Sequence, residues 1–230
     1  GAYGEFVIET DWHVGRILEF LDRERLAENT LVVFTSDNGP ETTWKQRAAK
    51  FKHQSNGQYR EGKRSIYEGG HRVPFFVRWP RGIAKPGRTF DGPVCQTDLL
   101  ATLAEMLGVS LPASAGEDSQ SFLTALKEDT TRQRVPMIHH SSNGGFAIRD
   151  GRWKLVMGVK RSKKRELYDL SSDSGELKNV VAENLEIAKR LERALTRIVV
   201  NGRSTPGDSV PNDTGFWDDL YWMDRNDYVR

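Results

Sequence analysis

Hydrophobic positions in the first part of the chain predict a helix and two strands. Apolar side chains recur at helical spacing over residues 4–27, which predicts a helix. Residues 31–35 form a continuous apolar run with β-branched members, which is typical of a strand buried on both faces. Residues 73–79 predict a second strand, which a Pro-Arg-Gly turn stops. A helix followed by a buried strand favours α/β layering.

The middle of the chain contains a second helical stripe. Apolar residues at helical spacing end at Leu107, and Gly108 follows as a typical stop. Thr97 or Asp98 is a suitable cap for the start of this helix. Between the two predicted strands, residues 39–70 are polar and rich in Gly, Asn, Gln and Lys. This stretch is too long for a simple connector and predicts a site loop or a pair of loops.

The last third predicts a small antiparallel sheet and one helix. Four short strands are expected, two of them joined by the Asp150-Gly151 hairpin signal, over residues 135–139, 145–149, 152–158 and 166–170. An apolar face from Leu185 to Ile198 predicts the helix. Beyond Gly202 the sequence favours either an extended arm that packs its aromatic residues or a flexible tail.

Composition restricts the class of protein. With 37% hydrophobic and 29% charged residues, the chain is not of the disordered, collagen-like or coiled-coil type. It contains no apolar run long enough for a membrane span, and its first residues show no targeting signal. The single cysteine, Cys95, excludes an internal disulfide and a multi-cysteine zinc site.

Charge is distributed unevenly along the chain. The net charge is only +2, from 34 basic and 32 acidic residues. Residues 40–90 hold twelve Lys or Arg against three Glu, an excess of +9, whereas residues 205–230 hold six Asp against two Arg, or −4. A basic segment indicates either an anionic ligand or a solvated loop. Charge alone favours the solvated loop.

Candidate chemistry begins where the first predicted strand ends, at Asp37 and Asn38. In open α/β sheets, ligands bind beyond the carboxyl ends of the strands. A carboxylate next to an amide oxygen is a pair of hard donors that suits Ca²⁺ or Mg²⁺ better than zinc. Taken alone, Asp-Asn-Gly is more often an ordinary turn.

A second motif changes this interpretation. The stretch Gly-Lys-Arg-Ser-Ile-Tyr-Glu-Gly-Gly-His-Arg-Val-Pro at residues 62–74 is followed by a strand and Trp-Pro. Together with the Asp-Asn-Gly strand end, it resembles the sulfatase family of the alkaline-phosphatase superfamily. The resemblance continues through the helix that ends at Leu107, the Arg-Asp-Gly-Arg-Trp-Lys hairpin at 149–154 and Leu-Tyr-Asp-Leu at 167–170, and covers about residues 5–200.

The resemblance implies a fold and a domain division. We expect an α/β chain, part of an alkaline-phosphatase-like α/β/α sandwich followed by a small antiparallel sheet and helix. Residues 1–133 would be the carboxyl-terminal part of the catalytic domain, 134–202 the small subdomain, and 203–230 an extended aromatic and acidic tail.

The resemblance also implies roles for individual residues. Asp37 and Asn38 would be two ligands of a Ca²⁺-type ion, with Mg²⁺ as the alternative, and Lys63 would contact the sulfate. A metal and an ammonium that meet the equatorial oxygens of the transition state would lower its energy. His53 and Arg60 are candidates for contact with the organic part of a substrate, as are Asn56 and His71, although surface loop residues are the more common case. His139 and His140 are expected to be structural, because neighbours on a strand point to opposite faces.

The sequence also departs from the family pattern. Family members carry a formylglycine nucleophile within Cys/Ser-x-Pro/Ala-x-Arg, and no Cys or Ser of this chain fits that pattern. The paired acidic metal ligands near the family's amino terminus and a downstream His that contacts the sulfate are not found either. We therefore expect the carboxyl-terminal half of a sulfatase, inactive alone, with the missing amino-terminal half as its partner and formylglycine in that half.

The function expected from the resemblance is hydrolysis of sulfate esters, of arylsulfatase type, with a sulfated carbohydrate as one substrate class. Two alternatives stay open: a phosphodiesterase or phosphonate hydrolase of the same superfamily, and a non-catalytic module that binds polyanions through its basic loops. We expect no membrane partner and no nucleic-acid partner. By resemblance, the compartment would be periplasmic, secreted or lysosomal.

Overall fold

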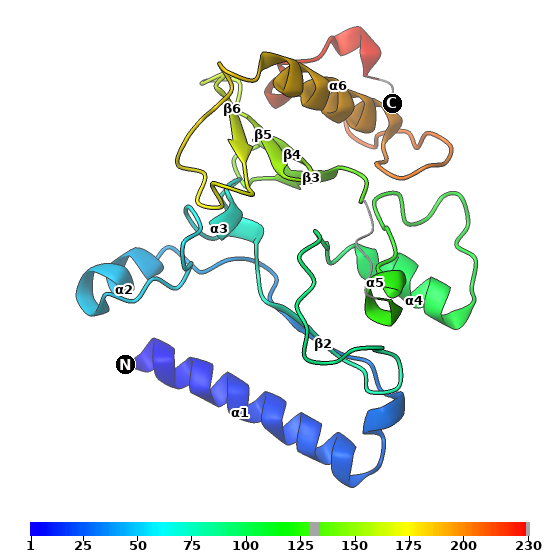
Figure 1. Cartoon of the computed structure of the whole chain (residues 1–230). Coiled ribbons are helices and arrows are strands. Elements are labelled where there is room, and N and C mark those ends of the chain that lie inside the picture. The colour runs from blue at the N-terminus through cyan, green and yellow to red at the C-terminus, as the bar shows by residue number, and fades with distance from the viewer. Residues whose placement is uncertain (129–133, 229–230) are drawn as a thin grey trace. The chain divides into compact units, whose positions relative to one another are not determined.

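The computed structural model describes residues 1–128 and 134–228 of the chain. Its helices are α1 (Ala2–Arg23), α2 (Trp44–Phe51), α3 (Glu68–His71), α4 (Asp98–Leu107), α5 (Leu123–Lys127) and α6 (Leu185–Asn201). Its strands are β1 (Val32–Thr35), β2 (Phe75–Arg78), β3 (Met137–His140), β4 (Phe146–Asp150), β5 (Trp153–Met157) and β6 (Arg165–Asp169). Short 3₁₀ turns are η1 (Ala27–Asn29), η2 (Asp218–Leu220) and η3 (Arg225–Asp227) (Figure 1).

These elements group into two compact units that alternate along the chain. One consists of Gly1–Thr35, Pro74–Phe90 and the described part of Thr124–Thr130, and the other consists of Ser36–Val73, Asp91–Leu123 and the described part of Thr131–Arg230. The expected boundary after residue 133 falls within 129–133, which lies outside the described residues.

The first unit contains α1 and a two-stranded antiparallel sheet. Val32 of β1 is opposite Arg78 of β2, and Thr35 is opposite Phe75. The strand predicted at 31–35 is confirmed. The prediction that it is buried on both faces was wrong, because its side chains are half-buried and Phe34 is 37% exposed. The physical reason is that β2 is its one strand neighbour in the described sheet, so one edge and much of its surface lack cover.

The second unit is built on a four-stranded antiparallel sheet of order β3-β4-β5-β6, as predicted. Strands β4 and β5 are joined at Asp150 and Trp153 by the predicted hairpin, with Gly151 at φ 57°. Helix α6 covers one face of the sheet, and the segment that contains α3 covers the other (Figure 1). Side chains of β5 are consequently buried on both sides of the strand.

Two hydrophobic clusters hold these layers together. The α6 cluster is made of Leu155, Met157, Leu167, Leu191 and Leu195, all fully buried, and their neighbours. Each such side chain stabilises the fold by roughly 1.5–3 kcal/mol relative to its exposure. The opposite face packs Ala147, Val156 and Tyr168 against Ile66 and Tyr67 from the predicted site loop. The loop is therefore fixed directly on the small sheet.

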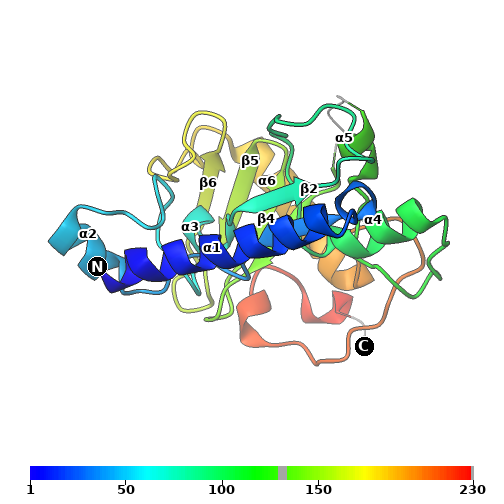
Figure 2. The ribbon, with the colours of Figure 1, turned by 90° about the horizontal axis from the view of Figure 1, so that it is seen from below.

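The carboxyl-terminal segment packs its aromatic residues rather than forming a flexible tail. The aromatic side chains that pack against the α6 cluster are those of Phe216, Trp217, Tyr221 and Trp222. The segment that carries them continues from the end of α6 and is drawn in orange to red (Figure 2). Trp222 meets Phe146 edge-on with ring centroids 5.4 Å apart. Of the two alternatives left open by the sequence, the packed arm is confirmed over the described residues.

The helix ending at Leu107 is confirmed as α4, with Gly108 in the left-handed conformation at its end. Asp98 is the first residue of this helix, and its carboxylate accepts from the backbone N–H groups of Cys95 and Gln120. The long polar stretch was expected to be loop only, yet it contains α2. Only Trp44, Ala48 and Phe51 stand at helical spacing in its eight residues, a pattern too short to identify a helix within a polar stretch. No helix of the described chain is long and apolar enough to cross a membrane.

Candidate active site

Backbone hydrogen bonds bring the two predicted motifs together. The N–H of Gly39 donates to the carbonyl of Gly70 at 2.9 Å, and the N–H of Lys63 donates to the carbonyl of Pro40 at 2.9 Å. The Asp37–Pro40 segment that follows β1 and the loop that carries Lys63 are therefore joined by two separate contacts. This arrangement was implied by the family resemblance, and the structure shows which atoms produce it.

Glycines make this approach possible. A Cβ at Gly39 would lie 1.8 Å from the Gly69 carbonyl oxygen, and one at Gly69 would lie 2.3 Å from that of Glu61. At Gly70 it would lie 2.2 Å from the oxygen of Ser65. The backbone at the Glu-Gly-Gly motif is therefore tightly packed against its neighbours. Close approach, rather than a positive φ, requires glycine at 69 and 70.

Asp37 and Asn38 present oxygen atoms at the strand end. One carboxylate oxygen of Asp37 accepts from the Asn38 N–H at 2.9 Å, and the side chain is exposed. The Asn38 amide nitrogen donates to the Gly39 carbonyl at 3.0 Å, which leaves the amide oxygen available. The donor chemistry fits a hard cation. Among the described residues, no group of three or more His, Cys, Asp and Glu side chains forms a metal cluster, so this pair would be part of a ligand set.

Lys63 lies between two residues in a strained backbone conformation. Glu61 has φ 60° and Arg64 has φ 76°, values that non-glycine residues rarely adopt and that are often found at functional sites. The Lys63 ammonium is 4.0 Å from the Glu41 carboxylate, and its side chain is 36% exposed. It is therefore neither buried in a structural pair nor extended away from all acidic groups.

Glu41, in the segment just after Pro40, contacts the loop that carries Lys63. Arg64 donates two hydrogen bonds to its carboxylate, at 2.6 and 3.1 Å. The Arg64 hydrogen bond, with help from the Thr42 N–H, lowers the pKa of Glu41 to about 2. Glu41 is therefore an anion at any physiological pH, and it contacts both cations that follow Gly62.

The two candidate substrate contacts occupy different environments. His53 is exposed just after α2. The Arg60 guanidinium donates to the Tyr168 hydroxyl at 3.0 Å and to the Glu176 carbonyl at 3.1 Å, and it stacks 3.6 Å above the Tyr67 ring. One of its guanidinium nitrogens, Nη1, is thus used within the protein. Asn56, also considered, is buried and closes its own loop by donating to Tyr59 and Glu61 carbonyls.

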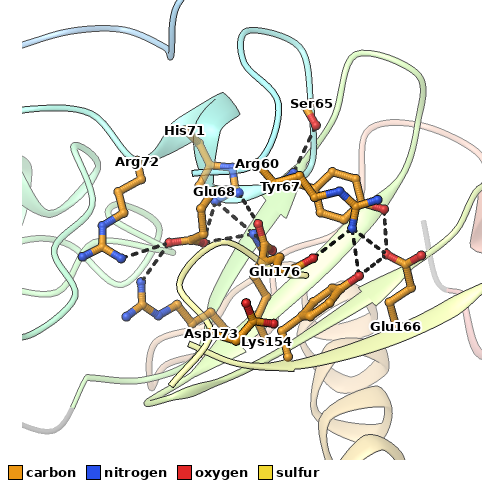
Figure 3. A network of polar contacts seen from close by, with 12 residues as sticks. Arg60, Ser65, Tyr67, Glu68, His71, Arg72, Lys154, Glu166, Asp173 and Glu176 are labelled. Atoms are coloured by element: carbon orange, nitrogen blue, oxygen red, sulfur yellow. Dashed lines mark hydrogen bonds and ion pairs between the residues drawn. The ribbon is translucent and has the colours of Figure 1, made fainter. Parts of the chain in front are cut away.

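A buried ionic network lies between α3 and the small sheet (Figure 3). The fully buried Lys154 ammonium lies 3.0 Å from Glu68 and 2.8 Å from Glu176. The Glu68 N–H donates to the Glu176 carboxylate at 2.6 Å. Two arginines, Arg72 and Arg149, each lie 3.6 Å from the second oxygen of Glu68. We call Glu68, Lys154 and Glu176 the buried triad.

The surroundings of the two carboxylates set their pKa values in opposite directions. Burial alone would raise the pKa of Glu68, but the hydrogen bond to His71 and the charge of Lys154 hold it well below its usual range. Burial raises the pKa of Glu176 despite its contact with Lys154. Glu68, which also has Arg149 beside it, is the more strongly ionised of the pair.

His71 belongs to this network. Its Nε2 atom lies 3.2 Å from Glu68 and 3.3 Å from the Lys154 ammonium. The ring stacks on His139 with centroids 3.9 Å apart, whereas His140 stacks on Phe146 across the strand. The expectation that these neighbouring histidines point to opposite faces is confirmed. Burial lowers the pKa of His71, and it lowers that of His139 far more.

Sequence reasoning did not find the buried triad. Lys154 alternates with Trp153 and Leu155 in a predicted strand, which indicates only that it faces away from the α6 side. Glu176 follows Asp-Ser-Gly in a polar turn and has φ 54°. A lysine within a strand was the available signal. Its burial depends on a segment 86 residues earlier in the chain, where its partner Glu68 lies.

The sheet, helix and strand-end loop define an alkaline-phosphatase-like α/β fold, and comparisons with known proteins agree. A solved structure from work on metabolism of multiple glycosaminoglycans by Bacteroides thetaiotaomicron matches with a TM-score of 0.76 and 33% identity, over 86% of this chain and 44% of that one. A phosphonate monoester hydrolase of Agrobacterium radiobacter, at 23% identity and a TM-score of 0.58, covers 84% of this chain and 39% of that chain and shares the fold.

Two family models match the chain. One, described as Sulfatase, covers residues 1–109, and the other, described as N-sulphoglucosamine sulphohydrolase, C-terminal, covers residues 57–201. The chain belongs to the sulfatase family and corresponds to the carboxyl-terminal part of a sulfatase.

Curated relatives extend this result. N-acetylgalactosamine-6-O-sulfatase of Bacteroides thetaiotaomicron is 34% identical over 86% of this chain and 42% of its own length. Human steryl-sulfatase is 37% identical over 62% of this chain and 24% of its own length. The chain therefore spans less than half the length of the curated relatives it matches.

Proposed function

We propose that this chain is part of an enzyme that hydrolyses sulfate esters, with Lys63 as its contact to the sulfate group. The observation that supports the proposal is the pair of backbone hydrogen bonds that joins the Asp37-Asn38-Gly39-Pro40 strand end to the Lys63 loop. Membership of the sulfatase family supports the reaction class.

In this proposal the chain's own residues bind and orient the sulfate. Asp37 and the amide oxygen of Asn38 would hold a Ca²⁺ ion, or Mg²⁺ as the alternative, which would polarise the sulfate oxygens when bound. The Lys63 ammonium would place a compact positive charge on an equatorial oxygen as negative charge develops there. Glu41, held ionised by Arg64, would restrict the range of motion of the Lys63 side chain.

No Cys or Ser in the chain lies in the formylglycine pattern, so the nucleophile would come from the upstream part of an intact sulfatase. We therefore expect the purified 230-residue chain to show no turnover of an aryl sulfate, because positioning groups alone leave bond cleavage uncatalysed. Robust hydrolysis by this chain would contradict the assignment.

The proposed substrate class is a sulfated carbohydrate. The model matched over residues 57–201 is described as N-sulphoglucosamine sulphohydrolase, and a relative at 34% identity is named for N-acetylgalactosamine 6-sulfate. The steryl-sulfatase match provides the rival substrate class. Comparing turnover of a sulfated amino sugar with that of a steroid sulfate by the intact enzyme would separate the two.

The central test is Lys63→Ala in an intact sulfatase that contains this chain. We expect a loss of kcat/KM of about 10²–10³-fold, as for removal of one preorganised donor. The matched control is Lys45→Ala, which removes an exposed α2 lysine paired with Glu61 at 3.1 Å and should retain activity. Equal activity of the Lys63 variant and the control would overturn the proposal.

The metal proposal has a separate test. Asp37→Ala combined with Asn38→Ala should abolish retention of one Ca²⁺ or Mg²⁺ per protein, measured by elemental analysis of the dialysed intact enzyme. Retention of zinc instead would favour the phosphodiesterase or phosphonate hydrolase alternative, because zinc prefers imidazole and thiolate ligands. Unchanged retention of the hard cation in the variant would contradict the ligand assignment.

A further inference from the structure

An arginine-rich groove lies along α6, within the second unit. It has a volume of about 480 Å³ and is lined mainly by Arg134, Asp150, Arg190, Arg193 and Arg197, with Val135, Pro136 and Ala194 beside them. Pockets for small ligands usually measure about 300–1,000 Å³. Nothing in the proposed sulfate site involves these residues.

Helical spacing gathers three of the four guanidinium groups on one face. Arg190, Arg193 and Arg197 are separated by three and four residues, so their side chains project from successive turns of the same face of α6. Arg134 enters from the segment before β3. Like charges at this spacing repel one another, so these three arginines do not stabilise the helix through their mutual contacts.

Two of these arginines are fixed by carboxylates. Arg190 lies 2.5 Å from Asp150, the last residue of β4. The largely buried Arg134 side chain forms a forked pair with Asp98, at 2.5 and 3.1 Å. These pairs hold the two guanidinium planes in place and neutralise their charge.

The other two arginines are not held by an ion pair, although the Glu186 carboxylate attracts the charge of Arg193 from a distance. Arg193 and Arg197 are exposed, and in the described part of the chain neither has an ion pair or a hydrogen bond to a side chain. The four arginines and the two aspartates leave a local charge of +2, because 4 − 2 = 2. The groove therefore has two charged forks, one helical turn apart, that can each accept an oxyanion in two-point fashion.

We infer that this groove binds an oligosaccharide through two of its sulfate or carboxylate groups, one on Arg193 and one on Arg197. Two separated forks favour a ligand with repeated anionic groups over a single inorganic ion. The choice of a sulfated saccharide rests on the proposed function, whereas the oxyanion chemistry follows from the arginines alone. The groove would hold a long substrate or its product through a segment other than the reacting ester.

The test measures binding without turnover. In an intact sulfatase that carries this chain, all variants would be made on a Lys63→Ala background, so that binding at the proposed sulfate site is weakened equally in each. The probes are a heparin-derived hexasaccharide, a single-stranded oligonucleotide of similar charge and inorganic sulfate, each titrated by calorimetry at low and at physiological salt.

We expect Arg193→Ala combined with Arg197→Ala to weaken hexasaccharide binding at least tenfold and to reduce its salt dependence. Arg193→Lys combined with Arg197→Lys should recover part of the loss, because charge returns without the fork. Lys189→Ala, on the same helix and paired with Glu186, is the matched control and should bind normally. Neither arginine is buried, so thermal unfolding should be unchanged in both double variants.

Three results would overturn the inference: equal hexasaccharide affinity in the Ala variant and the control, equal affinity for the oligonucleotide, or inorganic sulfate binding as tightly as the hexasaccharide. Different results would contradict the groove inference and the proposed function. Unchanged turnover in Lys63→Ala on the otherwise native enzyme contradicts the proposed function, while loss of hexasaccharide binding in the arginine variant would still establish the groove.

Discussion

Lys154 is a single residue of β5 that ties the small sheet to α3, the helical turn that follows the Lys63 loop. Its ammonium is fully buried and lies between two carboxylates from segments distant in the chain. Burial of charge is costly, and the cost is offset only while every partner stays in place. The buried triad therefore contributes specificity more than net stability: it selects the arrangement in which α3 sits on β5.

Replacing Lys154 by Met should be strongly destabilising. The change leaves Glu68 and Glu176 buried without their shared cation, and breaking such a pair typically costs about 3–5 kcal/mol. Chemical denaturation of the intact protein would measure the loss. Arg152→Met, which removes an exposed arginine paired with Asp169 at 2.8 Å, is the control and should cost less than about 1 kcal/mol. A Lys154 variant as stable as this control would contradict the account.

The histidine stack predicts a dependence of stability on pH. Burial lowers the pKa of His71 and, more strongly, of His139, whereas unfolded histidines titrate near about 6.5. Below that pH the unfolded chain binds protons that the folded chain does not. The free energy of unfolding should therefore be highest above about pH 6.5 and decrease as the pH falls.

Thermal unfolding between about pH 7.5 and 5.5 would measure this effect. His139→Phe keeps an aromatic ring against His71 and removes one titrating group whose Nε2 is buried with no hydrogen-bond partner in the described residues. The variant should lose less stability on acidification than the native protein. An identical decrease in both proteins would exclude His139 as the cause.

At the scale of elements, α3 is a single helical turn that depends on its glycines. Gly69 and Gly70 let it press against the backbone of residues 60–65, and the Gly69 N–H donates to Arg60 at 2.9 Å. The same contact orients the loop in which Lys63 lies. A change that disturbs the packing of α3 should therefore also displace Lys63, the proposed sulfate contact.

A methyl group at position 69 should disturb both the packing of α3 and the position of the Lys63 loop. In Gly69→Ala the new Cβ would meet two backbone oxygens, of Glu61 and Arg60, at 2.3 and 2.4 Å, and neither can rotate away. Overpacking of this kind typically costs about 1–3 kcal/mol. Gly15→Ala is the control: it lies within α1 with open space around it and should be neutral or stabilising by up to about 1 kcal/mol. Denaturation midpoints of the two variants that shift alike would contradict this explanation.

At the scale of the whole molecule, the two units differ in how fully they bury their apolar residues. The second unit has two closed clusters around its sheet. In the first unit, α1 has no buried residue, and Ile8 is 70% and Phe76 65% exposed. Apolar surface of this extent, together with an open two-stranded sheet, is typical of a surface that another segment covers.

The purified 230-residue chain should therefore associate with itself or with the upstream half of a sulfatase. Light scattering after size exclusion is expected to show oligomers, and Ile8→Lys combined with Phe76→Lys should shift the population towards monomer. Lys50→Glu, a surface change on α2, should leave the distribution unaltered. A native chain that is monomeric and unfolds in one cooperative transition would count against this prediction.

The sequence by itself determined the elements whose signals are local. Helical periodicity located α1, α4 and α6, and the Asp-Gly turn located the β4–β5 hairpin, because these patterns depend on neighbours within a few residues. The motifs at Asp37 and Lys63 were also readable from the sequence, since the family pattern preserves their spacing. Helix α2 was missed, because its eight residues give only about two turns of periodic signal within a polar stretch.

Only the tertiary structure decided which groups share a buried environment. Alternation along β5 says that Lys154 and Leu155 face opposite ways, but the cover on each face comes from segments far away in the chain, namely the α3 loop and α6. Burial, pKa shifts and the arginine groove all depend on such long-range contacts. The free energy of a charged group is set by every atom that surrounds it in the fold, and a linear sequence does not state that environment.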